Sequence, residues 1–144
     1  MFSADLSTRR FNGCTVVALR GELDLADAVA VTAALTAVAA RDPVIIVDLA
    51  GLEFIDSSGV AALARGRTQA RRAGGDLVLA APQRKVMRVL AVIRMNERFS
   101  VYATVKQAGR FRQRPVPVPV PVPRHPDPAT RRLSLVPAAA GPEA

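Results

Sequence analysis

The sequence predicts an α/β fold with a mixed sheet that starts with a β-hairpin. Three observations support this prediction. An Asn-Gly pair lies between two strand-like runs, a continuous β-branched run follows the first helical pattern, and helical and strand periodicities then alternate with short connections. The chain has 144 residues, of which 50% are hydrophobic and 22% charged, as is typical of one globular domain.

The first element is expected to be a hairpin formed by residues 6–11 and 14–19. Asn12-Gly13 lies between these strands and can supply the two positive φ angles that a tight type I′ turn requires. Cys14 is the only cysteine, so no internal disulfide can form. We expect Cys14 to be a small buried hydrophobe.

The first helix is predicted from Leu25 to Ala40. This segment is rich in alanine, and Val31, Leu35 and Val38 recur at the spacing of an amphipathic helix. Asp24 or a neighbour is expected to cap its N-terminus.

The next elements alternate between strand and helix. Residues 44–47 form a β-branched run typical of a strand that is buried on both faces in a parallel sheet. The sequence then predicts a helix from about Ser58 to Ala73 that Gly74-Gly75 stops, a strand at 77–80, a helix at 84–93, a short strand at 99–102 and a helical turn at about 104–109. In such sheets, functional residues gather where strands end and helices begin.

The last quarter of the chain has a different composition. Prolines occupy alternate positions from Pro115 to Pro123, which removes the amide donors that a helix or a sheet needs. We therefore divide the chain into a domain at 1–109 and a disordered, proline-rich basic tail at 110–144. The formal net charge of +8 is shared equally between these two parts.

No leader or membrane span is expected. The N-terminus lacks the apolar core of a signal peptide, and no apolar run approaches the roughly 18 residues that a membrane helix needs. The sequence therefore predicts a cytoplasmic protein.

Two motifs lie where strands should end and helices begin. Gly21-Glu22-Leu23-Asp24 precedes the first helix, and Phe54-Ile55-Asp56-Ser57-Ser58-Gly59-Val60 precedes the second. In this order and separation they resemble the signature of STAS-domain anti-sigma factor antagonists, over roughly residues 4–107. The resemblance implies a β-α superhelical fold whose helices lie largely on one face of a mixed sheet.

The resemblance also implies a function in bacterial partner switching, which regulates transcription in the stress response. The unmodified antagonist of this family binds a serine kinase that doubles as an anti-sigma factor, and so frees the sigma factor. Phosphorylation ends the binding, and a serine phosphatase restores it. The acceptor in the family motif directly follows the aspartate, which makes it Ser57 here, and Asp24 would border the kinase surface. No cofactor or metal is implied.

The residues themselves allow two interpretations of the serine pair. A serine at a strand-to-helix junction is most often a helix cap. With two serines, one hydroxyl can accept a backbone amide hydrogen while the other faces solvent. Asp56 could orient the Ser57 hydroxyl, and Gly59 would keep the surface clear for a kinase. A phosphate here would lie on helix-terminal amides, which favour anions. The resemblance, with these considerations beside it, implies phosphorylation at Ser57 and a partner-binding set made of Asp24, Asp56, Ser57, Ser58 and Gly59.

The resemblance is incomplete at the C-terminus. The family usually ends in a fuller fourth helix, whereas this chain reaches Arg114-Pro115 soon after Thr104, so we expect that helix to be short or absent. The proline-rich tail has no counterpart in the family pattern.

An enzyme is not expected. The only histidine, His125, lies among prolines in the tail, so a Ser-His-Asp triad would need a disordered segment held rigidly. The sequence around Ser57 is not a Gly-x-Ser-x-Gly elbow either.

Two alternatives to the sigma-factor function remain. One is a STAS scaffold or sensor module that does not act on a sigma factor, and the other, less favoured, is a basic nucleic-acid-binding protein. The second helix carries a cluster of cations that could be a solvated face, guide an acidic partner or attract nucleic acid. These cations are Arg65, Arg67, Arg71 and Arg72. An aromatic content of 4% leaves few platforms for stacking on bases.

Overall fold

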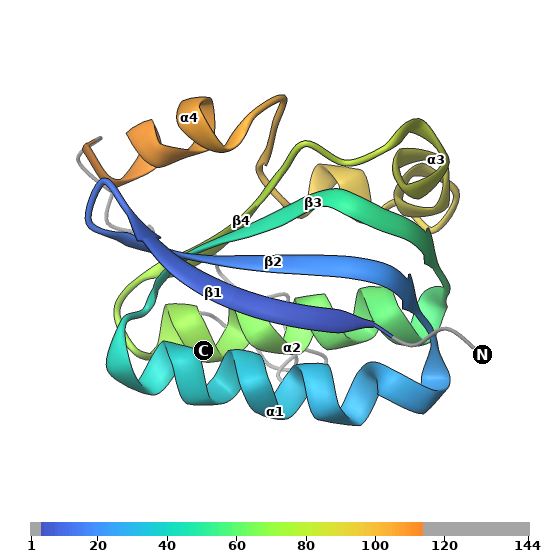
Figure 1. Ribbon diagram of the computed structural model, residues 1–144, viewed down its shortest axis with the longest axis horizontal. Helices are drawn as coiled ribbons and strands as arrows, with labels where there is room; N and C mark the ends of the chain where they lie inside the picture. The colour runs from blue at the N-terminus through green and yellow to red at the C-terminus, as the bar shows by residue number, and fades with distance from the viewer. Residues whose placement is uncertain (1–3, 114–144) are drawn as a thin grey trace, which may run out of the picture. The chain divides into compact units, whose positions relative to one another are not determined.

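The computed structural model describes residues 4–113, which contain one five-stranded sheet (Figure 1). The strands lie in chain order and are β1 (Asp5–Phe11), β2 (Cys14–Leu23), β3 (Val44–Ile55), β4 (Asp76–Ala80) and β5 (Val101–Tyr102). β1 pairs with β2 antiparallel, and every later pair is parallel. The predicted mixed sheet is thus confirmed. Nearly all of the predicted proline-rich tail, from Arg114 onward, lies outside the described residues.

The helices of the described segment are α1 (Leu25–Arg41), α2 (Ser57–Arg72), α3 (Arg84–Val92) and α4 (Val105–Ala108), with 3₁₀ turns at Met95–Glu97 and Gly109–Gln113. α1 and α2 pack side by side against one face of the sheet, and α3 packs against β3 (Figure 1). α4 has only four residues, in agreement with the short last helix that we expected. Within residues 4–113, no helix combines the length and the hydropathy needed to cross a membrane.

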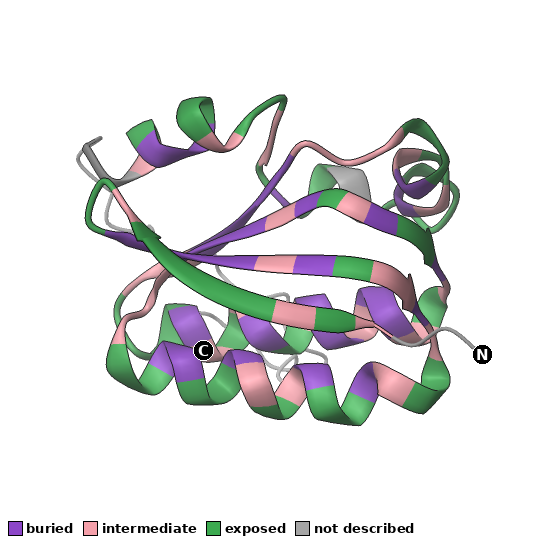
Figure 2. Cartoon of the chain, viewed as in Figure 1, coloured by how far each residue is buried: buried purple, intermediate pink, exposed green. Residues whose placement is uncertain are grey.

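Two apolar clusters bury the two faces of the sheet. Ile45 and Val47 of β3 contribute to the larger cluster, together with side chains of α1, α2 and α3, whereas Ile46 between them contributes to the smaller cluster under α4. Figure 2 shows the resulting buried stripes on β2 and β3. The prediction that this β-branched run is buried on both faces is confirmed. Cys14 is fully buried, as expected.

The hairpin turn and the C-terminus of α2 have the predicted conformations. Asn12 and Gly13 have φ angles of 51° and 78°, as a type I′ hairpin turn requires. Gly74 has a φ of 97°, and the N–H of Gly75 donates to the carbonyl of Ala70 at 2.9 Å, which closes the C-terminus of α2.

The length of β3 differs from the prediction. It has 12 residues instead of the predicted four, because it continues to pair with β2 as far as Ile55 after its pairing with β4 has ended at Asp48. This extension brings the ends of β2 and β3 to the same edge of the sheet.

Candidate functional site

The predicted site lies where β2 and β3 end together. Leu23 pairs with Ile55 at the carboxyl ends of these parallel strands, and the N–H of Asp56 donates to the carbonyl of Leu23 at 3.2 Å. Asp24 and Asp56 follow the two strands, and Ser57 is the first residue of α2. The sheet thus brings the two motifs, which are more than 20 residues apart in the sequence, to one edge.

Asp56, not a serine, caps α2. Its Oδ1 accepts a hydrogen bond from the N–H of Gly59 at 3.0 Å, and its backbone is extended. We expected a serine hydroxyl to take this amide and the helix to begin at Ser58. That expectation is wrong, because a carboxylate is an equally favoured cap and the helix begins one residue earlier, at Ser57.

The two serines differ in exposure. Ser57 is exposed, whereas Ser58 is half-buried. Within residues 4–113 neither hydroxyl takes part in a side-chain hydrogen bond, and none joins Asp56 to the Ser57 hydroxyl. Ser57 is therefore an exposed residue at the start of α2 whose hydroxyl does not cap the helix.

Gly59 is buried, so it does not clear the surface as we expected. A Cβ atom on Gly59 would lie 2.7 Å from both the carbonyl oxygen of Leu23 and Cγ1 of Ile55. Real Cβ contacts are essentially never this short. The absence of a side chain therefore lets α2 start directly against the ends of β2 and β3.

Asp24 caps α1, as predicted. Its Oδ1 accepts a hydrogen bond from the N–H of Ala26 at 3.0 Å, while its side chain remains half-buried. A role in partner binding remains a prediction for this residue.

Exposed apolar side chains occur close to these caps in the sequence, and sequence reasoning missed them. Leu25 and Val29 on α1 are 72% and 79% exposed, and Phe54 near the end of β3 is 46% exposed. Leu25 and Val29 are four residues apart and off the buried stripe of α1, which is the signal that could have identified them.

Two carboxylates lie at this edge, and each accepts a hydrogen bond from a helix N-terminal amide. Neither Asp24 nor Asp56 forms an ion pair within the described part of the chain, where the two ion pairs are Arg10–Asp42 and Arg67–Asp76. The site therefore combines two carboxylates that lack ion pairs within residues 4–113 with an exposed serine.

The arginines of α2 do not form one uniform face. Nε of Arg67 donates to Oδ1 of Asp76 at 3.0 Å, and its Nη1 donates to the carbonyl of Arg98. Arg67 therefore ties α2 to β4 and to the segment before β5. Arg65, Arg71 and Arg72 are exposed.

The fold and the site define a small mixed-sheet α/β domain with an exposed serine at a helix N-terminus. The chain belongs to the STAS domain family, because the model of that family matches residues 5–108. The resemblance seen in the sequence is thereby confirmed. No curated protein sequence matches the chain significantly.

Solved structures of anti-sigma factor antagonists share this fold. The chain is 26% identical to an anti-sigma factor antagonist from Mycobacterium paratuberculosis, with a TM-score of 0.66 over 73% of this chain and 90% of that one. A STAS-domain antagonist from Planctomyces limnophilus is 23% identical, with a TM-score of 0.68 over 77% and 100%. The antagonist SpoIIAA in its unphosphorylated form is 21% identical, with a TM-score of 0.65 over 76% and 96%.

Proposed function

We propose that this protein is an anti-sigma factor antagonist that binds an anti-sigma serine kinase and is inactivated by phosphorylation at Ser57. The observation that carries the proposal is the exposed Ser57 hydroxyl at the start of α2, whose cap is provided by Asp56. Similarity to solved antagonists, including one that is 26% identical, supports it. A serine phosphatase would return the protein to its binding form.

The partner surface would consist of the predicted site and the apolar side chains around it. Leu25, Val29 and Phe54 supply exposed apolar area, and Asp24 and Asp56 supply negative charge. A kinase surface with an apolar recess rimmed by Lys or Arg would complement this arrangement. Gly59 would contribute to kinase binding indirectly, because its close packing against Leu23 and Ile55 fixes the position at which α2 begins.

Phosphorylation would end binding through charge. A phosphate adds about −1.5 to −2 charges at neutral pH. At Ser57 this charge would join the uncompensated carboxylates of Asp24 and Asp56, in a surface that is desolvated on docking. Each 1.4 kcal/mol of resulting penalty weakens binding about tenfold.

The protein would act by binding and not by catalysis. Every step of chemistry at Ser57 would be carried out by the kinase and the phosphatase. Within residues 4–113 no hydrogen bond joins the carboxylate of Asp56 to the Ser57 hydroxyl, and its Oδ1 accepts from the N–H of Gly59, so Asp56 is not positioned as a base toward that hydroxyl.

The test uses the serine kinase that is recovered with the full chain from its native bacterium. With this kinase and ATP, wild-type protein should gain one phosphate on Ser57, which mass spectrometry locates. Ser57→Ala should bind the kinase tightly without being labelled, and Ser57→Asp should lose binding while circular dichroism shows an intact fold. Ser58→Ala is the matched control and should be labelled like the wild type.

Two results would contradict the proposal. Labelling on Ser58, or equal labelling of Ser57→Ala and wild type, would show that the acceptor is wrongly assigned. Recovery of partners that include no ATP-binding kinase would favour the scaffold or sensor function instead.

A further inference from the structure

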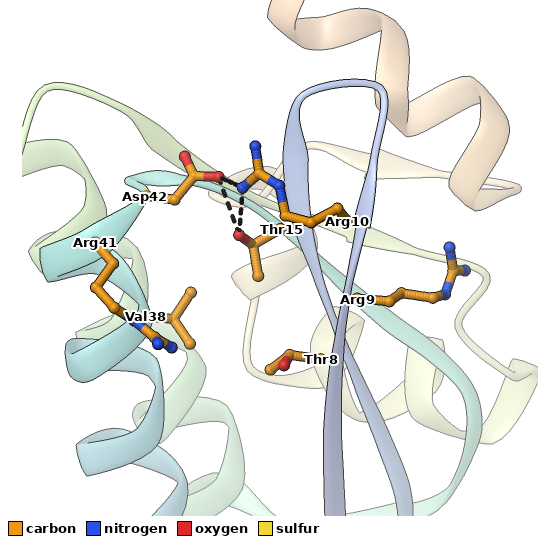
Figure 3. A pocket seen from close by; sticks show the side chains of 7 residues that line it. All are labelled: Thr8, Arg9, Arg10, Thr15, Val38, Arg41 and Asp42. Carbon is orange, nitrogen blue, oxygen red and sulfur yellow. Dashed lines mark hydrogen bonds and ion pairs between the residues drawn. The ribbon is translucent and has the colours of Figure 1, made fainter.

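A second candidate site lies at the opposite end of the sheet from Ser57. It is a groove of about 380 Å³ between β1 and the C-terminal end of α1. Thr15 at its base pairs with Ile45 at the start of β3, whereas Ser57 follows the end of that strand. Figure 3 shows the lining side chains, which are Thr8, Arg9, Arg10, Thr15, Val38, Arg41 and Asp42.

Arg10 is held in place at one end of this groove. Its Nη1 donates to Oγ1 of Thr15 at 3.0 Å and to Oδ2 of Asp42, and Oγ1 of Thr15 donates to the same carboxylate oxygen at 3.0 Å (Figure 3). Burial raises the pKa of Asp42, but hydrogen bonds from the N–H of Val44, from Arg10 and from Thr15 outweigh it and hold the pKa below its usual value. The Arg10 side chain is 63% exposed, so its other N–H groups remain available to a ligand.

Arg41 supplies a second guanidinium. It lies in the last turn of α1, is exposed, and takes part in neither of the ion pairs found within residues 4–113. Arg41 and Val38 line the groove from α1, and Thr8 lines it from β1 (Figure 3). Asp42 can neutralise only one of the two guanidiniums, so the groove carries a net positive charge.

Arg9 also lines the groove, but its charged end does not face it. Its guanidinium lies on the other side of β1, 5.9 Å from the centre of the Phe11 ring, and points away from the groove (Figure 3). The charge of the groove therefore comes from Arg10 and Arg41.

We propose that this groove binds a small phosphate ester. Guanidinium groups present N–H donors in a planar fork that matches phosphate oxygens, and the hydroxyl of Thr8 adds another donor. A volume of about 380 Å³ exceeds what a phosphate group alone fills and lies within the usual range for small-molecule sites. Val38 offers an apolar wall for the organic part of the ligand. The proposal does not depend on the function of Ser57.

Arg71 provides a matched control for Arg41. Both are exposed arginines in the last turn of a helix, where a cation stabilises the helix dipole, but Arg71 does not line the groove. Replacing either residue with glutamine removes the same charge from the same kind of position. A difference in phosphate affinity between the two variants would therefore arise from the groove and not from the overall charge of the chain.

The experiment titrates the full ¹⁵N-labelled chain with inorganic phosphate and with glycerol phosphate at constant ionic strength, and follows amide shifts by NMR. Both probes should shift Thr8, Arg10, Thr15 and Arg41. Arg41→Gln and Thr8→Val should each weaken binding, the first by about tenfold, as expected for loss of a charged hydrogen bond. Arg71→Gln and Ser57→Asp should bind like the wild type. Tighter binding of the ester than of phosphate would show that the apolar wall contributes.

The proposal would be overturned in three ways. Equal weakening by Arg41→Gln and Arg71→Gln would show nonspecific attraction to a basic surface. Shifts confined to residues outside the groove would place the anion elsewhere. Equal affinity for the two probes would mean that the site recognises free phosphate and not an ester.

Discussion

The packing at Gly59 allows a quantitative prediction for Gly59→Ala. In a helix interior, alanine is favoured over glycine by about 1 kcal/mol. At this position, however, the added Cβ would lie 2.7 Å from the backbone oxygen of Leu23, which cannot move without the end of β2. Overpacking of this kind typically costs about 1–3 kcal/mol. We expect a net loss of about 1–2 kcal/mol in the free energy of unfolding.

The comparator is Gly66→Ala, which makes the same substitution in the same helix. The nearest atoms to a Cβ on Gly66 are Cδ1 of Leu35 at 2.6 Å and Cβ of Leu35 at 3.0 Å, so a buried side chain and not a backbone oxygen would have to move. Gly66→Ala should therefore destabilise the domain less than Gly59→Ala does. Urea unfolding measures both variants, and melting should show a drop of roughly 5 °C or more for Gly59→Ala.

One result would refute this reasoning. If Gly59→Ala were as stable as the wild type or more stable, helix propensity would dominate and α2 would not start in close contact with Leu23. A loss of kinase binding by that variant with full stability would instead point to Gly59 as a direct contact.

Three further predictions concern the cap of α2, the carboxylate of Asp42 and the proline-rich tail. Asp56→Ala should lower the free energy of unfolding by about 1 kcal/mol, because it removes the cap of α2. Ser58→Ala should change it by less than about 0.5 kcal/mol. Equal losses for the two variants in denaturant unfolding would contradict the assignment of Asp56 as the cap. The lowered pKa of Asp42 means that its ionised form contributes stability in full above about pH 4, and that this is lost as the pH falls through the folded-state pKa. Asp42→Asn should therefore be less stable at neutral pH and lose less stability on acidification, and an unchanged pH dependence of unfolding would refute this. Deletion of residues 113–144 should shift the melting temperature by less than about 5 °C, since a proline-rich segment is expected to bury little apolar surface, and a larger drop would show that it packs on the domain.

The parts of the fold that could be predicted best from the sequence depend on the conformational preferences and spacing of residues close together in the chain. Asn12-Gly13 fixes its turn because few other residue pairs adopt two positive φ angles, and Gly74 stops α2 for the same reason. The buried stripe of α1 could be read from the spacing of Val31, Leu35 and Val38, all of which are buried.

Features that depend on pairing between distant segments were not predictable in this way. The part of β3 from Asp48 onward also contains Gly51 and Glu53 and does not resemble a buried strand, yet β2 pairs with it through two irregularities in register. The groove depends on Arg10 and Asp42, which are 32 positions apart and meet only because the hairpin lies beside the end of α1. Neither residue belongs to a sequence motif.

The capping of α2 by Asp56 bears on how a switch at Ser57 would act. If Ser57 were the cap, a phosphate there would compete for the amide that begins the helix, and modification would disturb the fold. Because Asp56 already holds the N–H of Gly59, a phosphate on Ser57 could be added while that hydrogen bond remains. The change would then be one of surface charge, next to a carboxylate that no cation of the described residues neutralises. We therefore expect the phosphorylated domain to keep the backbone amide shifts of its β-sheet and to differ mainly around residues 56–60 and Asp24, and widespread shift changes in the sheet would show that the switch works by unfolding.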